Sequence, residues 1–146
     1  MDDSPVATTT GFLLSKIANV ALARFTEELG GLGLRPKHYG VLAAVASEPA
    51  GSQQAIGKSL GLVPSAIVSI IDDLEKLGAI TKEHPANSRR EFVIVMTDRG
   101  HELFATATEI GERVDREVLR GLSVAQRKTL HHSLTLVADR LGIVGS

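Results

Sequence analysis

Cysteine is absent from this chain of 146 residues. No disulfide framework, thiolate metal site or thiol redox switch can therefore form within it. Aromatic residues are also scarce, at 3% of the chain, so a ligand pocket lined by aromatic rings would be sparse. Function classes that depend on cysteine chemistry are excluded.

Long apolar runs are lacking as well. None approaches the roughly 20 residues that a membrane-spanning helix needs. Residues 1–5 carry two aspartates and lack the basic region of a signal peptide. We therefore expect a cytoplasmic protein. Its 146 residues, 43% of them hydrophobic, indicate one domain over residues 1–146 with a sizeable core.

No strong excess of one charge sign marks the chain, whose formal net charge is −1. This is not the global basic signature that many DNA-binding proteins show. The charges are unevenly distributed: residues 35–90 hold seven basic and five acidic side chains, a surplus of two, whereas residues 1–34 hold two basic and four acidic ones. Any affinity for nucleic acid is therefore expected to be modest and salt-dependent.

Signs of catalysis are missing. None of the five histidines has a metal-ligand spacing or a nucleophile motif beside it, so we expect neither an enzyme nor a bound metal or other cofactor. Gly30, Gly31 and Gly33 lack the preceding strand of a dinucleotide fingerprint and are better explained as a helix cap and turn. The histidines are His38, His84, His101, His131 and His132.

The most informative segment that is present is an amphipathic helix over residues 64–77. Pro64 suits its first turn, and Gly78 suits a left-handed cap after its end. The polar face carries Ser65 and Ser69 and is free to meet solvent or a partner. The apolar residues recur at helical spacing and predict a buried face: Ile67, Ile70, Ile71, Leu74 and Leu77.

A shorter helix precedes it over residues 53–60, after a break at residues 49–51 and with Ser52 as N-cap. Residues 61–63 then form a turn that contains Gly61. Two helices joined by about three residues that include a glycine form a helix-turn-helix, whose second helix can enter a DNA major groove about 12 Å wide. An ordinary helical corner within a core is the alternative at this point.

A β-hairpin is predicted next, with strands over residues 79–83 and 92–96 and a loop over residues 84–88. Arg89 and Arg90 follow the loop and give the hairpin a basic tip. Guanidinium groups in such a place suit phosphates or a narrow minor groove. After a helix-turn-helix, this order favours a wing over two solvated surface arginines.

Amphipathic helices flank this unit. Two are predicted over residues 11–29 and 36–47, and two more begin at the N-caps Thr97 and Ser123 and run to about residue 120 and to near the end of the chain. The last two have heptad-like seams, which suggest pairing across a two-fold axis; an intramolecular bundle is the alternative. The seams comprise Leu103, Ala107, Ile110, Val114 and Val118, then Leu130, Leu134, Val137 and Leu141.

Three short motifs, in their order along the chain, resemble the MarR family of bacterial transcriptional regulators. The resemblance spans nearly the whole chain and includes the order of helices and hairpin. It implies a homodimer that binds a pseudo-palindromic DNA operator, usually as a repressor, and releases the DNA when a small effector binds, often an aromatic acid or other lipophilic compound. The motifs are Leu74-Glu75-Lys76-Leu77-Gly78-Ala79-Ile80, Ser88-Arg89-Arg90 and Met96-Thr97-Asp98-Arg99-Gly100.

The resemblance, together with the helix positions, selects the residues expected to contact DNA or an effector. Ser88 stands where the family usually has an aspartate that orients the wing arginines, and Val63 lacks the capping oxygen often found there. Few side chains of the second helix can hydrogen bond to bases, so direct readout should be thin. Predicted DNA contacts are Gln53, Gln54, Lys58, Pro64, Ser65, Ala66, Ser69, Arg89 and Arg90. Predicted effector contacts are Arg35, His38 and Tyr39, with Arg35 on a phosphate and Tyr39 in the core as the alternative.

The predicted fold class is mainly α with a small β-hairpin, a winged helix-turn-helix with N- and C-terminal dimerisation helices. Residues 35–100 would form the DNA-binding part, and residues 8–34 and 101–146 the dimerisation helices. The predicted function is a ligand-responsive repressor that acts as a homodimer. The alternative is a winged-helix module for protein contacts without specific DNA binding, which the near-neutral charge and the apolar Ala66 and Val68 favour.

Overall fold

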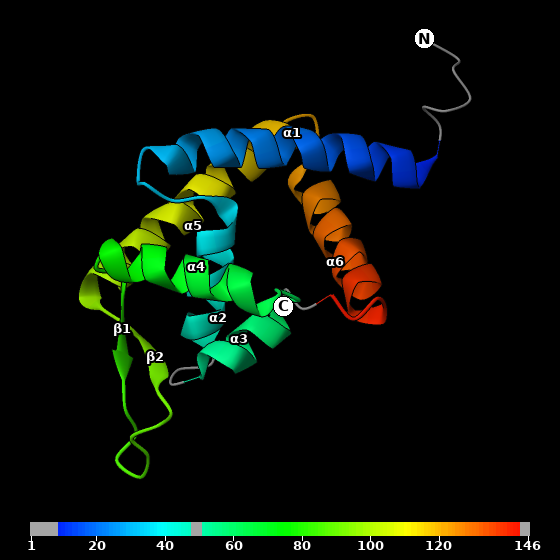
Figure 1. Cartoon of the computed structure of the whole chain (residues 1–146). Helices are drawn as coiled ribbons and strands as arrows, with labels where there is room; N and C mark the ends of the chain where they lie inside the picture. Colours follow the sequence, from blue (N-terminus) through cyan, green and yellow to red (C-terminus); the bar gives the residue numbers. More distant parts are fainter. Residues whose placement is uncertain (1–8, 48–50, 144–146) are drawn as a thin grey trace.

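The computed structural model describes residues 9–47 and 51–143, which form six helices and one two-stranded antiparallel sheet (Figure 1). The predicted fold class, mainly α with a small hairpin in winged helix-turn-helix order, is confirmed. The outer ends of both expected dimerisation segments, and residues 49 and 50 before the short helix, lie outside the described residues. In chain order the elements are α1 (Thr10–Gly30), α2 (Pro36–Ser47), α3 (Gln53–Ser59), α4 (Pro64–Lys76), β1 (Ile80–Glu83), β2 (Val93–Met96), α5 (Asp98–Val118) and α6 (Val124–Arg140).

Helix ends follow local capping chemistry, and they fall within one residue of most predicted ends. Leu60 and Leu77, expected as the last residues of their helices, are the C-caps of α3 and α4. Val63 caps α4 without a side-chain hydrogen bond, as its apolar side chain requires. Four other helices are preceded by an N-cap residue whose side-chain oxygen accepts a backbone N–H of the first turn. These N-caps are Thr9, Ser52, Thr97 and Ser123.

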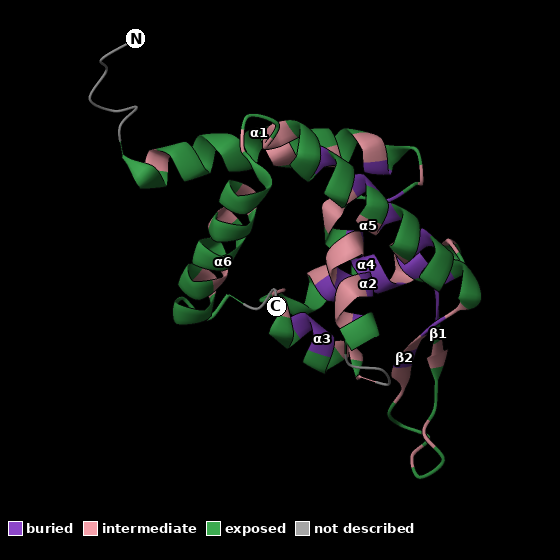
Figure 2. Cartoon of the chain, turned by 180° about the vertical axis from the view of Figure 1, so that it is seen from behind, coloured by how far each residue is buried: buried purple, intermediate pink, exposed green. Residues whose placement is uncertain are grey.

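The core lies where α2, α4, α5 and the hairpin meet, and Figure 2 shows the buried residues gathered there. Ile80 of β1 pairs with Met96 of β2, which sets the register of the hairpin. A bridge between Ser52 and Val93 ties the start of α3 to β2. The helix-turn-helix and the hairpin are therefore held by one core. Its fully buried large side chains are Leu29, Leu34, Val41, Leu42, Ile71, Leu74, Ile80 and Ile94.

By contrast, α1 and α6 leave apolar side chains uncovered. Among the described residues, α6 has no buried side chain, and α1 has only Leu29. Figures 1 and 2 both show α6 standing apart from α2, α3 and α4. In contrast, α5 packs on α1 and α2, and its seam residues Leu103, Ala107, Ile110 and Val114 are buried within the chain. The intramolecular alternative therefore holds for the α5 seam, and pairing across a two-fold axis stays a prediction for the α6 seam. Within residues 9–47 and 51–143 no single helix is long and apolar enough to cross a membrane. Among these residues, only α3 and α4 taken together, across the bend between them, have the length and apolar composition of a membrane span. The exposed large apolar residues include Leu13, Leu14, Ile17, Val20, Leu22, Leu134, Leu136, Val137 and Leu141.

Candidate nucleic-acid interface

The helix-turn-helix is formed by α3 and α4, which meet at a bend of 115°. Gly61 takes a left-handed φ of 64° in the turn, a conformation that costs glycine little. Gly57 lets the helices approach closely, because a Cβ there would lie 3.1 Å from Cγ2 of Ile67. The angle and the short turn match the arrangement in which a second helix enters the major groove.

The exposed face of α4 is the surface that this geometry presents. Its opposite face is buried in the core through Ile67, Ile70, Ile71 and Leu74, and the last part of α4 bears the acidic residues discussed below. The first two turns are free of acidic side chains. Their outward residues are Pro64, Ser65, Val68 and Ser69, which are exposed, and Ala66, which is half-buried.

Most of the predicted backbone contacts of the helix-turn-helix lie together. A groove of about 440 Å³ runs between α3 and α4. Gln53, Gln54 and Lys58 line it from α3, and Pro64 and Val68 line it from α4. The amide and ammonium groups of α3 thus border the same surface as the first turns of α4. The role of each side chain in DNA contact stays a prediction.

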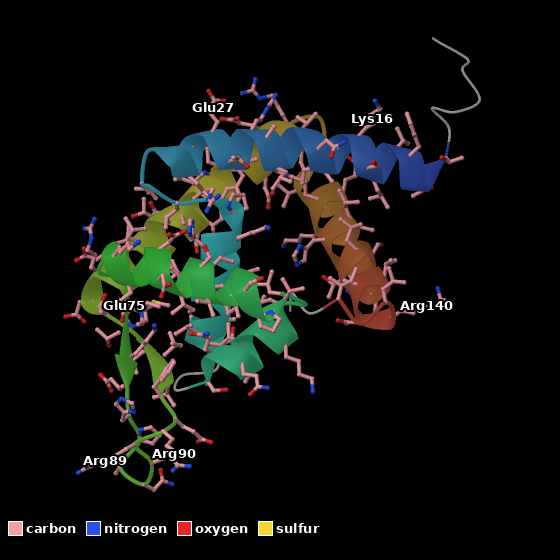
Figure 3. The ribbon with its side chains drawn as sticks, viewed as in Figure 1. Lys16, Glu27, Glu75, Arg89, Arg90 and Arg140 are labelled. Atoms are coloured by element: carbon pink, nitrogen blue, oxygen red, sulfur yellow. The ribbon has the colours of Figure 1, made fainter. Side chains whose placement is uncertain are left out.

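Arg89 and Arg90 lie at the tip of the hairpin, well away from the helices, and Figure 3 shows their side chains extending into solvent. Ser88, which replaces the expected aspartate, accepts backbone N–H groups from Arg90 and Glu91 through Oγ, each at 3.3 Å. The His84 ring lies 2.9 Å from the carbonyl oxygen of Glu91 and closes the loop from the other side. A hydroxyl therefore shapes this turn where a carboxylate was expected.

The acidic side chains near the end of α4 are paired with cations. Lys82 of β1 lies with Nζ 3.5 Å from Asp72 and 3.8 Å from Glu75. Its ammonium also lies 5.4 Å from the ring centre of Phe92. Partial neutralisation of two carboxylates reduces the repulsion that a DNA phosphate would meet at this end of the helix. The sequence alone did not predict that the Lys82 ammonium pairs with carboxylates of α4.

Asp73 forms a second link, which sequence reasoning missed. His38 is 3% exposed, and its Nδ1 accepts the backbone N–H of Arg35 at 2.9 Å. Nε2 must then carry the ring hydrogen and donate it to Asp73 Oδ2 at 3.0 Å. This hydrogen bond lowers the pKa of Asp73, and the nearby charges of Arg35 and Lys76 lower it further. The result is a polar connection between α2 and the recognition helix α4.

Two of the motifs that carry the family resemblance touch each other at the end of α4. Thr97 donates its hydroxyl to the carbonyl oxygen of Gly78 at 2.5 Å, and Arg99 Nε donates to that of Leu77 at 3.1 Å. Gly78 has a φ of 74°, and Gly100 packs against the backbone of Ala79. These contacts satisfy carbonyls at the helix end and hold α4 against the start of α5.

The three predicted effector residues do not line one cavity. Tyr39 borders an apolar pocket of about 500 Å³ between α1, α2 and α5, where Phe25, Thr108 and Val114 also lie. Its ring packs 5.4 Å from the ring centres of Phe25 and Phe104, and its hydroxyl lies 3.2 Å from Thr108 Oγ1.

Arg35 and His38 instead border a smaller hollow with Asp73 and Lys76. Arg35 pairs weakly with Asp73 at 3.5 Å and is largely exposed. Among the described residues, no group of three or more histidines and carboxylates could hold a metal ion. The predicted effector role of Arg35, His38 and Tyr39 remains a prediction.

Comparison with known proteins places this architecture among transcriptional regulators. Residues 32–91 match a family model described as MarR family. A putative transcriptional regulatory protein for the hcr operon of Thauera aromatica is 32% identical over 98 residues, 67% of this chain; the match covers 59% of that relative, less than two thirds of its length. The HTH-type transcriptional repressor Rv2887 of Mycobacterium tuberculosis is 25% identical over 133 residues, which cover 91% of this chain and 93% of that protein.

Solved structures share the fold. The Mycobacterium tuberculosis protein Rv2887 in complex with DNA has a TM-score of 0.78 at 22% identity, covering 89% of this chain and 98% of that chain. CouR from Rhodococcus jostii RHA1, bound to p-coumaroyl-CoA, has a TM-score of 0.75 at 25% identity, covering 91% and 94%. The winged helix, the contacts between its motifs and the family match agree: residues 32–91 match the MarR family, and the chain has the fold of MarR-family transcriptional regulators.

Proposed function

We propose that the protein is a homodimeric repressor that binds a specific DNA operator and releases it when a small ligand binds. The observation that carries this proposal is the placement of two surfaces on one rigid unit. The exposed first turns of α4 and the Arg89/Arg90 tip both project from the core that joins the helix-turn-helix to the hairpin (Figures 1 and 3). Residues 35–100 would form this DNA-binding part, in the cytoplasm where bacterial DNA lies.

Each surface has a distinct part in the proposed complex. The first turns of α4 enter the major groove, and Arg89 and Arg90 follow the backbone or enter the minor groove. Gln53, Gln54 and Lys58 lie along the groove beside α4 and fix the protein on the phosphates. The pairing of Asp72 and Glu75 with Lys82 supports this placement, because it reduces the negative charge near the duplex.

The dimer would be built from α1, α5 and α6. The uncovered apolar side chains of α1 and α6 support this proposal, because a helix with no buried residue gains little from its own chain. A symmetric partner would cover both helices at once and would present two copies of α4 to two operator half-sites.

The pocket beside Tyr39 is the proposed ligand site. It is mainly apolar, it lies between the helices assigned to the dimer and α2 of the winged helix, and Tyr39 and Thr108 supply hydroxyl groups at its wall. Solved relatives are described with p-coumaroyl-CoA and salicylic acid, which supports a small organic ligand. A ligand that wedges α1 and α5 away from α2 would change the position of α4 through the shared core.

The decisive experiment measures binding of the purified protein to the DNA upstream of its own gene and to an unrelated duplex, across a salt series. Salt-dependent preference for the upstream DNA is the expected result. Equal and weak binding to both duplexes would overturn the operator proposal and favour a module for protein contacts, whose apolar site would then be the exposed Val63 and Val68.

A further inference from the structure

The first two turns of α4 offer unusual chemistry for reading DNA. Their exposed side chains include hydroxyls at Ser65 and Ser69, but no arginine, lysine, asparagine or glutamine. Apolar side chains stand beside the hydroxyls: Val68 is 43% exposed and Val63 is 63% exposed. The bidentate contacts to guanine and adenine that specify most major-groove sequences therefore cannot come from this face.

Apolar side chains on this face can still read sequence, because one base carries an apolar group in the major groove. That group is the C5 methyl of thymine, and small apolar side chains are its usual partners. Cytosine, adenine and guanine carry no methyl group at this edge. A valine held in the groove thus distinguishes thymine from the other bases without a hydrogen bond.

We infer that Val68 is a specificity-determining residue that contacts thymine methyl groups in each operator half-site. This inference rests on the proposed function, because it needs α4 in the major groove. Pro64 and Val68, one turn apart, form an apolar row beside the hydroxyl row of Ser65 and Ser69. A serine hydroxyl can either donate or accept a hydrogen bond, so it pairs with many base edges and distinguishes bases poorly. The apolar row therefore contributes more to the discrimination between bases.

A residue that distinguishes bases must be held in a fixed position, and Val68 is held in this way. Its neighbour Ile67 is buried against Gly57, which fixes the rotation of α4 relative to α3. As a β-branched residue in a helix, Val68 strongly prefers one rotamer and gives up little freedom on binding. It also borders the groove lined by Gln54 and Lys58, so the phosphate contacts proposed for α3 would bring it onto the base edges.

The test is a uracil scan of the operator. Each thymine of the footprinted site is replaced by deoxyuridine in both half-sites, which removes only the methyl group and keeps base pairing and hydrogen-bonding groups. We expect affinity to fall about fourfold when one methyl group that touches Val68 is removed, and about fifteenfold for a symmetric pair, at one or two thymines per half-site. Replacement of the other thymines should leave affinity within about twofold of the normal operator.

Two variants assign the effect to its residue. Val68→Ala should bind the normal operator more weakly and should lose its sensitivity to uracil at the same thymines, as in a double-mutant cycle. Ser69→Ala, the matched control on the hydroxyl row, should retain that sensitivity. Thermal unfolding verifies that both variants fold, which the exposure of both positions favours.

The outcomes separate this inference from the function on which it rests. Specific operator binding with no uracil-sensitive thymine, or with sensitivity unchanged in Val68→Ala, overturns the inference and leaves the regulator proposal intact. Absence of any preference for the upstream DNA overturns both. Sensitivity that disappears only in Val68→Ala supports the assignment.

Discussion

His38 on α2 donates a hydrogen bond from Nε2 to Oδ2 of Asp73 on α4, over 3.0 Å. The other ring nitrogen accepts the backbone N–H of Arg35, so both polar atoms of a buried ring are satisfied. This pair connects the start of α2 to the recognition helix, and it gives α4 a polar anchor in addition to its apolar stripe. The orientation of α4 therefore depends on α2, which also borders the proposed ligand pocket through Tyr39.

Replacement of the ring tests this anchor. His38→Ala removes both hydrogen bonds and leaves a cavity in a closely packed site, so we expect a loss of about 2–3 kcal/mol in the free energy of unfolding. Urea unfolding followed by circular dichroism measures it. Lys37→Ala, at the exposed neighbouring position, is the control and should stay within about 0.5 kcal/mol of the wild type. Equal midpoints for the two variants would contradict the structural role of His38.

The contacts of Asp73 imply that the stability of the fold depends on pH. The hydrogen bond from His38 lowers the pKa of this carboxyl in the folded protein below its ordinary value of 3.8. The unfolded chain then binds the proton more tightly, so the contribution of Asp73 is present above pH 3.8 and is lost as the pH falls through the lowered pKa.

The comparison that measures this contribution is between wild type and Asp73→Asn. We expect the difference between their urea midpoints to be constant near neutral pH and to narrow as the pH falls below 3.8. A difference that does not change across this range would show that Asp73 forms no stabilising link in the folded state.

Substitution by alanine should have opposite effects on stability at two glycines of α5. At Gly100 an added Cβ would overlap the carbonyl oxygen of Ala79 and lie 2.6 Å from Cγ of Met96, so Gly100→Ala should cost about 3 kcal/mol or prevent folding. At Gly111 the nearest atom would be Phe25 Cε2 at 3.7 Å, an ordinary contact, so Gly111→Ala should stabilise the helix by about 0.5–1 kcal/mol. Thermal melts of the two variants check both signs. Similar melting temperatures would mean that α5 does not pack on Ala79 as described.

The arginines of the hairpin tip predict a change in salt dependence. An Arg89→Ala, Arg90→Ala double variant should bind the upstream DNA more weakly, and the slope of log K against log salt should shrink by about one unit for each phosphate that is no longer bound. The control removes two cations far from the tip, Lys16→Ala with Arg140→Ala (Figure 3), and should change the slope little. An unchanged slope in the hairpin variant would rule out its role as a wing on DNA.

Local signals predicted most of the architecture from the sequence. The capping oxygens, the left-handed Gly78 and the helical spacing of the α4 stripe depend only on neighbours within a turn or two, so their effects could be predicted without tertiary information. The same holds for the exposed basic tip, because a loop between two short strands must project from them.

Contacts between residues far apart in the chain could not be predicted from the sequence. His38 and Tyr39 were grouped as effector residues, yet neighbours on a helix point about 100° apart and these two lie at different hollows. The partners Asp73 and Thr108 are 35 and 69 positions away in the chain, and no local pattern pairs them. The pairing of Lys82 with Asp72 and Glu75 likewise arises from the way the hairpin folds back on α4.

The last prediction concerns the surface that the chain leaves uncovered on α6. Leu134 is 40% exposed and Val137 is 51% exposed, and both lie on the seam predicted from heptad spacing. Leu134→Asp with Val137→Asp would place charges where we propose that a second copy packs, and burying them unpaired costs several kcal/mol. We therefore expect a monomer by analytical ultracentrifugation, with operator affinity reduced at least about a hundredfold because one half-site must bind alone. His132→Asp, on the opposite side of the same helix, should remain dimeric and bind DNA normally. A dimeric double variant would place the association surface elsewhere, whereas a monomer that still binds the full operator tightly would separate DNA recognition from dimerisation.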